Sequence, residues 1–164
     1  MLATLLADRG KQNFVRLAWD KLHALPGGTL AFSRLVGLAA PYTSTIHAHV
    51  VAVEPGRAEV TMNDRKGVRN HIDCIHAVAL ANLVELTGNT ALAYSLPADA
   101  RFIVSKMNVE YLAKARGPIR AIGTCEVPAT SERRELEVLV RIENAEGKEV
   151  TRGTLSSLVG PKKQ

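Results

Sequence analysis

The spacing of apolar side chains predicts two helices in the first part of the chain. Between Lys11 and Leu25, apolar residues recur every three or four positions with polar residues between them, as on a helix with one buried face. The sequence Pro26-Gly27-Gly28 then breaks the pattern. A second, more apolar segment runs from Thr29 to Ala40 and stops before Pro41. We therefore expect a helical extension over residues 1–42.

The period then changes to two, which is typical of half-buried strands. Apolar positions alternate from Thr43 to Val53, and the alternation resumes from Arg57 to Asn63 after a turn at Glu54-Pro55-Gly56. Four more strand-like runs lie in the C-terminal half: Arg101 to Tyr111, Ile119 to Val127, Arg134 to Asn144, and Lys148 to Val159. The last two are joined by Asn144-Ala145-Glu146-Gly147, which is a good hairpin signal.

Between these two groups of strands, the segment from His76 to Tyr94 is apolar on nearly every side. It is long enough for about five turns of helix, and such a helix is normally enclosed by protein all round. One enclosed helix and six mostly antiparallel strands predict an α+β fold in which the sheet wraps around the helix. At 164 residues the chain suits one domain, with the core over residues 43–160.

The net charge of +5 raises the question of a nucleic-acid partner. The basic residues are scattered and few aromatic side chains stand among them, which argues against nucleic acid. A polyanionic small molecule such as coenzyme A fits mild positive charge equally well. No apolar run approaches the ~20 residues needed to span a bilayer, and the first ten residues lack the features of a signal peptide. Cys74 and Cys125 are expected to be free buried thiols, which suits a cytoplasmic protein.

Three polar residues interrupt the apolar helix. Asn82, Glu85 and Asn89 are spaced by three and then four positions, so they line one stripe. A carboxylate among apolar side chains is costly to bury unless it has a partner, and desolvation makes it a suitable general base. The alternative is that Glu85 reaches solvent or pairs with a nearby arginine.

The start of the same helix is a second candidate for chemistry. Its first backbone N–H groups, beginning at Ala77, lack partners within the helix and carry the positive end of the dipole, so they suit a developing oxyanion. Asn70 and His76 stand just before it. For these two side chains the alternatives are a loop-bracing amide and an N-terminal cap.

Other side chains suggest weaker sites. His47 and His49 share a strand face, and with His71 and His76 they suggest a metal site. No carboxylate or cysteine completes a recognisable ligand spacing, so we expect no metal. Cys74 lacks the surroundings that would lower a nucleophile's pKa.

The order Asn70, His76-Ala77 and Glu85 resembles the active-site signature of hot-dog thioesterases of the phenylacetate-pathway type. In that signature an Asn precedes a His-Gly-Gly at the helix start, and an Asp or Glu follows within the helix. The segment Asn108 to Gly123 is similar to the strand and turn that follow in that family. The resemblance covers about Thr43 to Val159, and the DUF4442-like branch of the superfamily is the closest to it.

The resemblance implies a hot-dog fold, a homodimer or a tetramer, and hydrolysis of an acyl thioester, in particular an acyl-coenzyme A, without a cofactor. Glu85 would act as base or nucleophile. The N–H of Ala77, with help from His76, would hold the oxyanion, and Asn70 would orient the thioester or the water. Ala77-Val78 stands where many members have Gly-Gly, which narrows the helix mouth but keeps the backbone donor.

The substrate-binding residues follow from the same resemblance. Asn82 and Asn89 would contact the substrate beside Glu85. The loop before the helix carries Arg65 and Arg69, which are ordinarily part of a solvated basic turn. In a thioesterase they become contacts for the phosphates of coenzyme A.

Two other functions remain open. One is a hot-dog dehydratase or hydratase, in which a histidine and a carboxylate move protons on an acyl chain. The other is a non-catalytic acyl-coenzyme A-binding domain, although a sensor gains nothing from a buried carboxylate.

The helix geometry also predicts where the site lies. His76 and Glu85 are nine residues apart, which on an α-helix means about 180° around the axis and ~13 Å along it. Glu85 cannot reach a carbonyl group held at the start of its own helix. The site is therefore expected to combine two subunits.

Overall fold

The computed structural model describes residues 13–162. The elements follow in the order α2 (Phe14–Leu22), α3 (Gly28–Ala39), α4 (Pro41–Ser44), β1 (His49–Glu54), β2 (Arg57–Met62), the 3-10 helix η1 (Lys66–Val68), α5 (Ala77–Ser95), β3 (Ala100–Tyr111), β4 (Ile119–Cys125), β5 (Arg134–Asn144) and β6 (Glu149–Pro161). Every helix and strand expected from the sequence has a counterpart here. Lys11, where the first predicted helix begins, lies outside the described residues.

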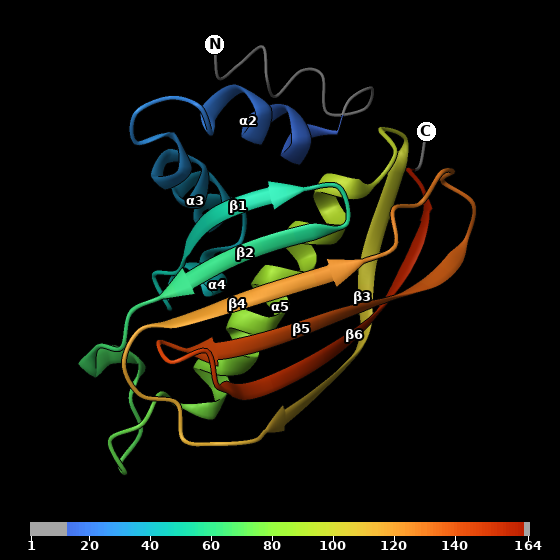
Figure 1. Ribbon diagram of the computed structural model, residues 1–164. Helices are drawn as coiled ribbons and strands as arrows, with labels where there is room; N and C mark the ends of the chain where they lie inside the picture. The colour runs from blue at the N-terminus through green and yellow to red at the C-terminus, as the bar shows by residue number, and fades with distance from the viewer. Residues whose placement is uncertain (1–12, 163–164) are drawn as a thin grey trace.

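The strands form one antiparallel sheet in the order β1-β2-β4-β5-β6-β3. The sheet curves around α5, which lies against its inner face (Figure 1). This arrangement confirms the α+β fold with a sheet wrapped around one long helix. β1 and β3 form the two edges of the sheet, and within the described part of the chain β3 pairs only with β6.

The long helix α5 packs closely against the sheet because two glycines stand where the surfaces meet. Leu83 and Val84 have no exposed surface. A Cβ atom on Gly88 would lie 2.4 Å from Leu155 Cδ1, and one on Gly153 would lie 2.3 Å from Val84 Cγ1. Although α5 is apolar, no helix within residues 13–162 is long and apolar enough to cross a membrane.

The N-terminal helices α2 and α3 cover the C-terminal end of α5 beside β1 (Figure 1). Trp19 of α2 meets Phe32 of α3 edge-on, with ring centroids 5.0 Å apart. Asn13 Nδ2 donates to the carbonyl oxygens of Ala93 and Leu96 at 2.7 and 2.8 Å. These bonds satisfy carbonyl groups at the end of α5 and fix α2 to it.

The first strand starts later than its alternating pattern predicts. The expected strand from Thr43 begins only at His49, because Pro41 occupies the first turn of the extra helix α4, a position that suits its fixed φ. His47 then has a φ of 52°, which interrupts an extended backbone. A bulge after Val50 shifts the alternation within the strand itself.

Candidate functional site

The start of α5 offers backbone N–H donors to a ligand. His76 caps the helix, and its Nδ1 accepts a hydrogen bond from the N–H of Val78 at 3.1 Å. The hydroxyl of Tyr111, at the end of β3, donates to the carbonyl oxygen of Ala77 at 3.1 Å. Within residues 13–162 the N–H of Ala77 has no hydrogen-bond acceptor. This N–H lies at the positive end of the helix dipole, where it can stabilise an oxyanion.

The capping bond gives His76 one of its two predicted roles. The sequence leaves open whether this histidine caps the helix or assists the oxyanion. With Nδ1 accepting from Val78, the ring serves as the cap. The backbone N–H of His76 also donates to the carbonyl of Val68 at 2.7 Å, which ties the helix start to the preceding loop.

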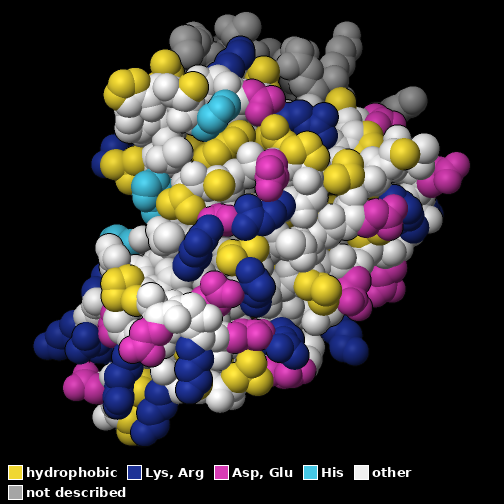
Figure 2. Space-filling model, viewed as in Figure 1, with side chains coloured by type: hydrophobic (Ala, Val, Ile, Leu, Met, Phe, Trp, Pro, Cys, Tyr) yellow, Lys and Arg dark blue, Asp and Glu magenta, His cyan; other side chains and the backbone are white. Residues whose placement is uncertain are grey.

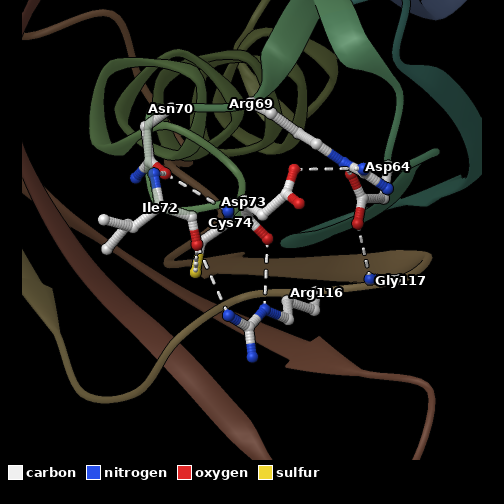
Figure 3. A network of polar contacts seen from close by, with 8 residues as sticks. All are labelled: Asp64, Arg69, Asn70, Ile72, Asp73, Cys74, Arg116 and Gly117. Carbon is white, nitrogen blue, oxygen red and sulfur yellow. Dashed lines mark hydrogen bonds and ion pairs between the residues drawn. The ribbon is translucent and has the colours of Figure 1, made fainter.

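Asn70 forms a turn within that loop. Its Oδ1 accepts hydrogen bonds from the N–H groups of Ile72 and Cys74 at 3.0 and 3.2 Å. Figure 3 shows the carboxamide oxygen turned into the loop. The loop-bracing alternative therefore describes this oxygen, and Nδ2 has no partner among residues 13–162 and remains a donor for a ligand.

A buried carboxylate holds the same loop in place. Asp64, whose side chain is 8% exposed, accepts from Arg69 Nε at 2.6 Å and from the N–H of Gly117 at 2.9 Å. The Arg69 guanidinium lowers the pKa of the Asp64 carboxyl, and the Gly117 N–H adds to that effect. Arg116 closes the network by donating to the carbonyl oxygen of Asp73 at 3.1 Å (Figure 3).

The two arginines predicted to bind phosphate differ in their surroundings. Arg69 contacts two carboxylates, those of Asp64 and, at 3.4 Å, Asp73. Arg65 donates from Nη2 to the carbonyl oxygen of Thr45 at 2.5 Å, and no carboxylate in the described chain pairs with it. Figure 2 shows Lys and Arg side chains gathered at this end of the molecule.

The polar stripe on α5 has unused hydrogen-bonding capacity. Glu85 is half-buried, and no described residue forms a hydrogen bond or ion pair with it. Asn82 is buried, and its Nδ2 donates to the carbonyl oxygen of Tyr42 at 3.4 Å. The Oδ1 atoms of Asn82 and Asn89 are both buried without a partner. Because buried polar atoms are normally paired, these three side chains together suit a polar ligand.

The helix start and the stripe do not meet within one chain. α5 is a single helix from Ala77 to Ser95, so Glu85 lies about 12 Å along the axis from Ala77 at ~1.5 Å per residue. A glutamate side chain cannot span that distance to reach a group bound at Ala77.

Comparison with known proteins identifies the family. The family model that matches, over residues 28–159, is that of a domain of unknown function, DUF4442. The chain belongs to the DUF4442 family. A structural-genomics protein of known crystal structure is 35% identical to this DUF4442 chain, with a TM-score of 0.78, and the match covers 91% of this chain and 99% of that one. No curated protein matches this DUF4442 chain.

More distant structures show the same fold. A protein of unknown function from Pseudomonas aeruginosa, described as a probable thioesterase, is 21% identical with a TM-score of 0.72, over 84% of this chain and 97% of its own. A thioesterase family protein from Silicibacter pomeroyi is 15% identical with a TM-score of 0.67, over 79% of this chain and 96% of its own. The fold of the DUF4442 chain is the hot-dog fold of the thioesterase superfamily.

Two features of the DUF4442 site were not found by sequence reasoning. Tyr111 reaches Ala77 only because β3 ends opposite the helix start, and no sequence spacing encodes that register. An apolar pocket of about 300 Å³ between the N-terminal helices and α5 is the second. The apolar faces of the two predicted helices were a partial signal for it.

Proposed function

We propose that this DUF4442 protein hydrolyses an acyl thioester, an acyl-coenzyme A in particular. The observation that carries the proposal is Glu85, an unpaired half-buried carboxylate between two amides whose oxygens lack partners. A carboxylate without a partner among residues 13–162 is available to act on a bound group.

The chemistry requires two elements, a base or nucleophile and an oxyanion donor. As a base, Glu85 takes a proton from a water molecule while the oxygen of that water attacks the thioester carbonyl carbon. As a nucleophile, the carboxylate attacks that carbon itself to form an anhydride, which water then opens. In either route the Ala77 N–H stabilises the oxyanion, and the C–S bond breaks to release the thiolate. Asn70 Nδ2 orients the thioester or the water.

The site combines two protomers in this proposal. β3 is a twelve-residue edge strand that, among residues 13–162, pairs on one side only. Met107 and Tyr111 on this strand are 41% and 50% exposed, although they pair with the inward-facing positions Leu155 and Thr151 of β6. An exposed strand edge with apolar inner side chains suits pairing with a second copy. Such pairing would bring the start of α5 in one protomer toward the polar stripe on α5 of the other.

Coenzyme A is the proposed carrier because basic residues gather beside the helix start. Arg65 has no carboxylate partner among residues 13–162, and Lys66 next to it is exposed. Arg69, although paired, is 40% exposed and can also meet phosphate. Guanidinium groups bind phosphates through charge-assisted hydrogen bonds.

The similar structures support hydrolysis more than dehydration. The Pseudomonas aeruginosa protein is described as a probable thioesterase, and the Silicibacter pomeroyi protein is a thioesterase family protein.

Release of free thiol from a panel of acyl-coenzyme A esters tests the proposal. We expect wild-type turnover with at least one of the short, medium, long or aromatic acyl groups. Glu85→Gln should lower turnover at least ~100-fold, the scale of lost acid–base catalysis. Its melting temperature should not fall, because Glu85 has no partner in its own protomer to lose.

Glu137→Gln is the matched control, because Glu137 is an exposed glutamate on β5 away from α5's stripe. It should leave turnover unchanged. Near-normal turnover by Glu85→Gln would remove Glu85 from the mechanism, and no thiol release from any ester would favour a binding domain.

A further inference from the structure

An apolar pocket lies between the N-terminal helices and the C-terminal half of α5. Its volume is about 300 Å³, and its walls come from α2, α3, α5 and the start of β3. Among residues 13–162 no charged side chain lines it, and the polar side chains there are Thr43, Asn89 and Thr90. The hydroxyl of Thr90 is already bonded to the carbonyl of Leu86 at 2.7 Å. The pocket therefore offers an apolar ligand almost no competing polar group.

Asn89 marks the polar end of this pocket. It lines the pocket, and its Oδ1 is buried without a partner. Asn89 follows Glu85 by one helical turn on the same stripe, so the pocket begins where the stripe of unused polar atoms ends. A ligand with a polar head and an apolar tail fits this arrangement in one direction only. Its head would lie near Glu85 and Asn89, and its tail would run toward Phe14 and Phe102, which lie on the pocket's apolar wall.

Helix α2, which forms one wall of the pocket, is fixed by hydrogen bonds to the end of α5. Asn13 Nδ2 donates to the carbonyl oxygens of Ala93 and Leu96, and Arg16 Nε donates to that of Tyr94 at 3.0 Å. These bonds fix α2 to the end of α5, and Phe32 of α3 is buried beneath the same wall. A wall fixed by hydrogen bonds to main-chain atoms gives the pocket a definite length.

A neighbouring hollow is less suitable for an alkyl chain. It lies between α3, α4 and β1, with a volume of about 710 Å³, and shares Val36, Thr43 and Leu86 with the first. Arg34 and His47 also line it, so it presents charge and polar groups to any occupant. The smaller pocket is the one whose chemistry matches an alkyl chain.

We propose that the pocket binds the aliphatic chain of the acyl group and that α2 and α3 set its maximum length. This inference rests on the proposed function for the chemistry of the head group, and on the pocket alone for the chain. At ~30 Å³ per heavy atom, the share of a water molecule in the liquid, the cavity holds about ten carbons. The substrate is therefore of medium chain length, with its carbonyl beside Glu85.

Substitution of one pocket alanine tests the proposal. Ala93 lines the pocket, whereas Ala31 of α3 is half-buried and does not. Ala93→Leu and Ala31→Leu make the same change in side-chain volume inside and outside the pocket. We expect Ala93→Leu to shorten the longest well-accepted chain by about three carbons, because leucine adds three carbons to a space that is already filled. Ala31→Leu should leave the chain-length profile unchanged.

Two independent readouts separate this inference from the proposed function. The first is calorimetric binding of straight-chain fatty acids, which needs no hydrolysis, and the second is kcat/KM over a series of acyl-coenzyme A esters. If Ala93→Leu binds only shorter fatty acids than wild type does, and neither protein hydrolyses any ester, the pocket is supported and the proposed function is overturned. Hydrolysis with the same chain-length profile in wild type and Ala93→Leu would overturn the pocket.

A second variant keeps the test decisive if Ala93→Leu folds poorly. Leu35 also lines the pocket, and Leu35→Ala removes side-chain volume from the α3 wall. We expect it to extend the accepted chain length. An unchanged or shortened limit in Leu35→Ala would contradict a role of α3 in setting that limit.

Discussion

The basic side chains before α5 divide into those that brace the loop and those available to a ligand. Arg69 holds the buried Asp64, so much of its charge is already compensated. Arg65 forms its one hydrogen bond with a neutral carbonyl group, that of Thr45, and its charge has no carboxylate partner in the described chain. A compensated cation gains little from a phosphate group, whereas an uncompensated one gains more.

Arg65→Ala should therefore raise KM for an acyl-coenzyme A and leave kcat nearly unchanged. Loss of one partly exposed phosphate contact costs about 1 kcal/mol, which is roughly a fivefold rise in KM. The contact is the same in the ground and transition states, so it affects binding alone. Steady-state kinetics with the coenzyme A ester measures this.

The control is the same acyl group on a short neutral thiol that carries no phosphate. Its KM should not change in Arg65→Ala. An equal rise in KM with both substrates, or a change confined to kcat, would show that Arg65 acts through the loop and not through phosphate.

At this scale the sequence predicts which residues stand together on one helix but not what they contact. The spacing of Asn82, Glu85 and Asn89 places them on one stripe because helical periodicity is local. The cap formed by His76 was one of two alternatives, and only the position of Val78 N–H showed it. Tyr111 could not be found in this way, since its contact depends on long-range packing.

The loop from β2 to α5 is the element that orients the helix mouth. Its chain reversal is held by Asp64, whose carboxylate bonds Arg69 inside the loop and the N–H of Gly117 outside it. The site residues Asn70 and His76 lie on the same loop. Loosening this element would disturb the helix mouth, although Asp64 itself is not among the residues proposed to contact the substrate.

Asp64→Asn should lower the melting temperature at pH 7 by roughly 2–4 °C, the shift that a modest loss of stability causes in a domain of this size. The pKa of Asp64 is lowered in the folded state, so its contribution is present above the unfolded pKa of about 3.9 and is lost as the pH falls through the folded value. The difference between wild type and variant should therefore shrink in acid. Thermal unfolding from pH 7 down to pH 3 measures it.

Asp73→Asn is the control for the loop, because Asp73 meets the same Arg69 at 3.4 Å but is 82% exposed. It should change the melting temperature little at any pH. If the two variants behave alike, or if the deficit of Asp64→Asn grows in acid, Asp64 does not hold the loop through its charge.

Elements were predicted well where the periodic pattern is long, and less well where backbone geometry overrides it. The helix from His76 to Tyr94 and the hairpin at Asn144 follow from local patterns, and both are present. The strand expected from Thr43 fails because Pro41 favours a helical turn and His47 takes a positive φ. The alternation of apolar and polar side chains does not indicate the helical turn at Pro41 or the positive φ of His47.

At the scale of the whole molecule, the proposed site takes one half from each of two protomers. The free Ala77 N–H and the loop with Asn70 lie at one end of α5, and Glu85 lies about 12 Å along the same helix. The edge strand β3 is unpaired on one side and exposes Met107 and Tyr111. A two-fold pair of protomers would place each helix mouth against the partner's Glu85, giving two equivalent sites.

Mixing two inactive variants tests this shared site most directly. Glu85→Gln and Asn70→Ala subunits are combined under conditions that allow exchange, which mass spectrometry verifies, and thiol release is then measured. Each heterodimer has one doubly damaged site and one intact site, so random exchange should restore about a quarter of wild-type activity. If each site lies within one chain, every site keeps one lesion, and the exchanged mixture stays as inactive as its parents.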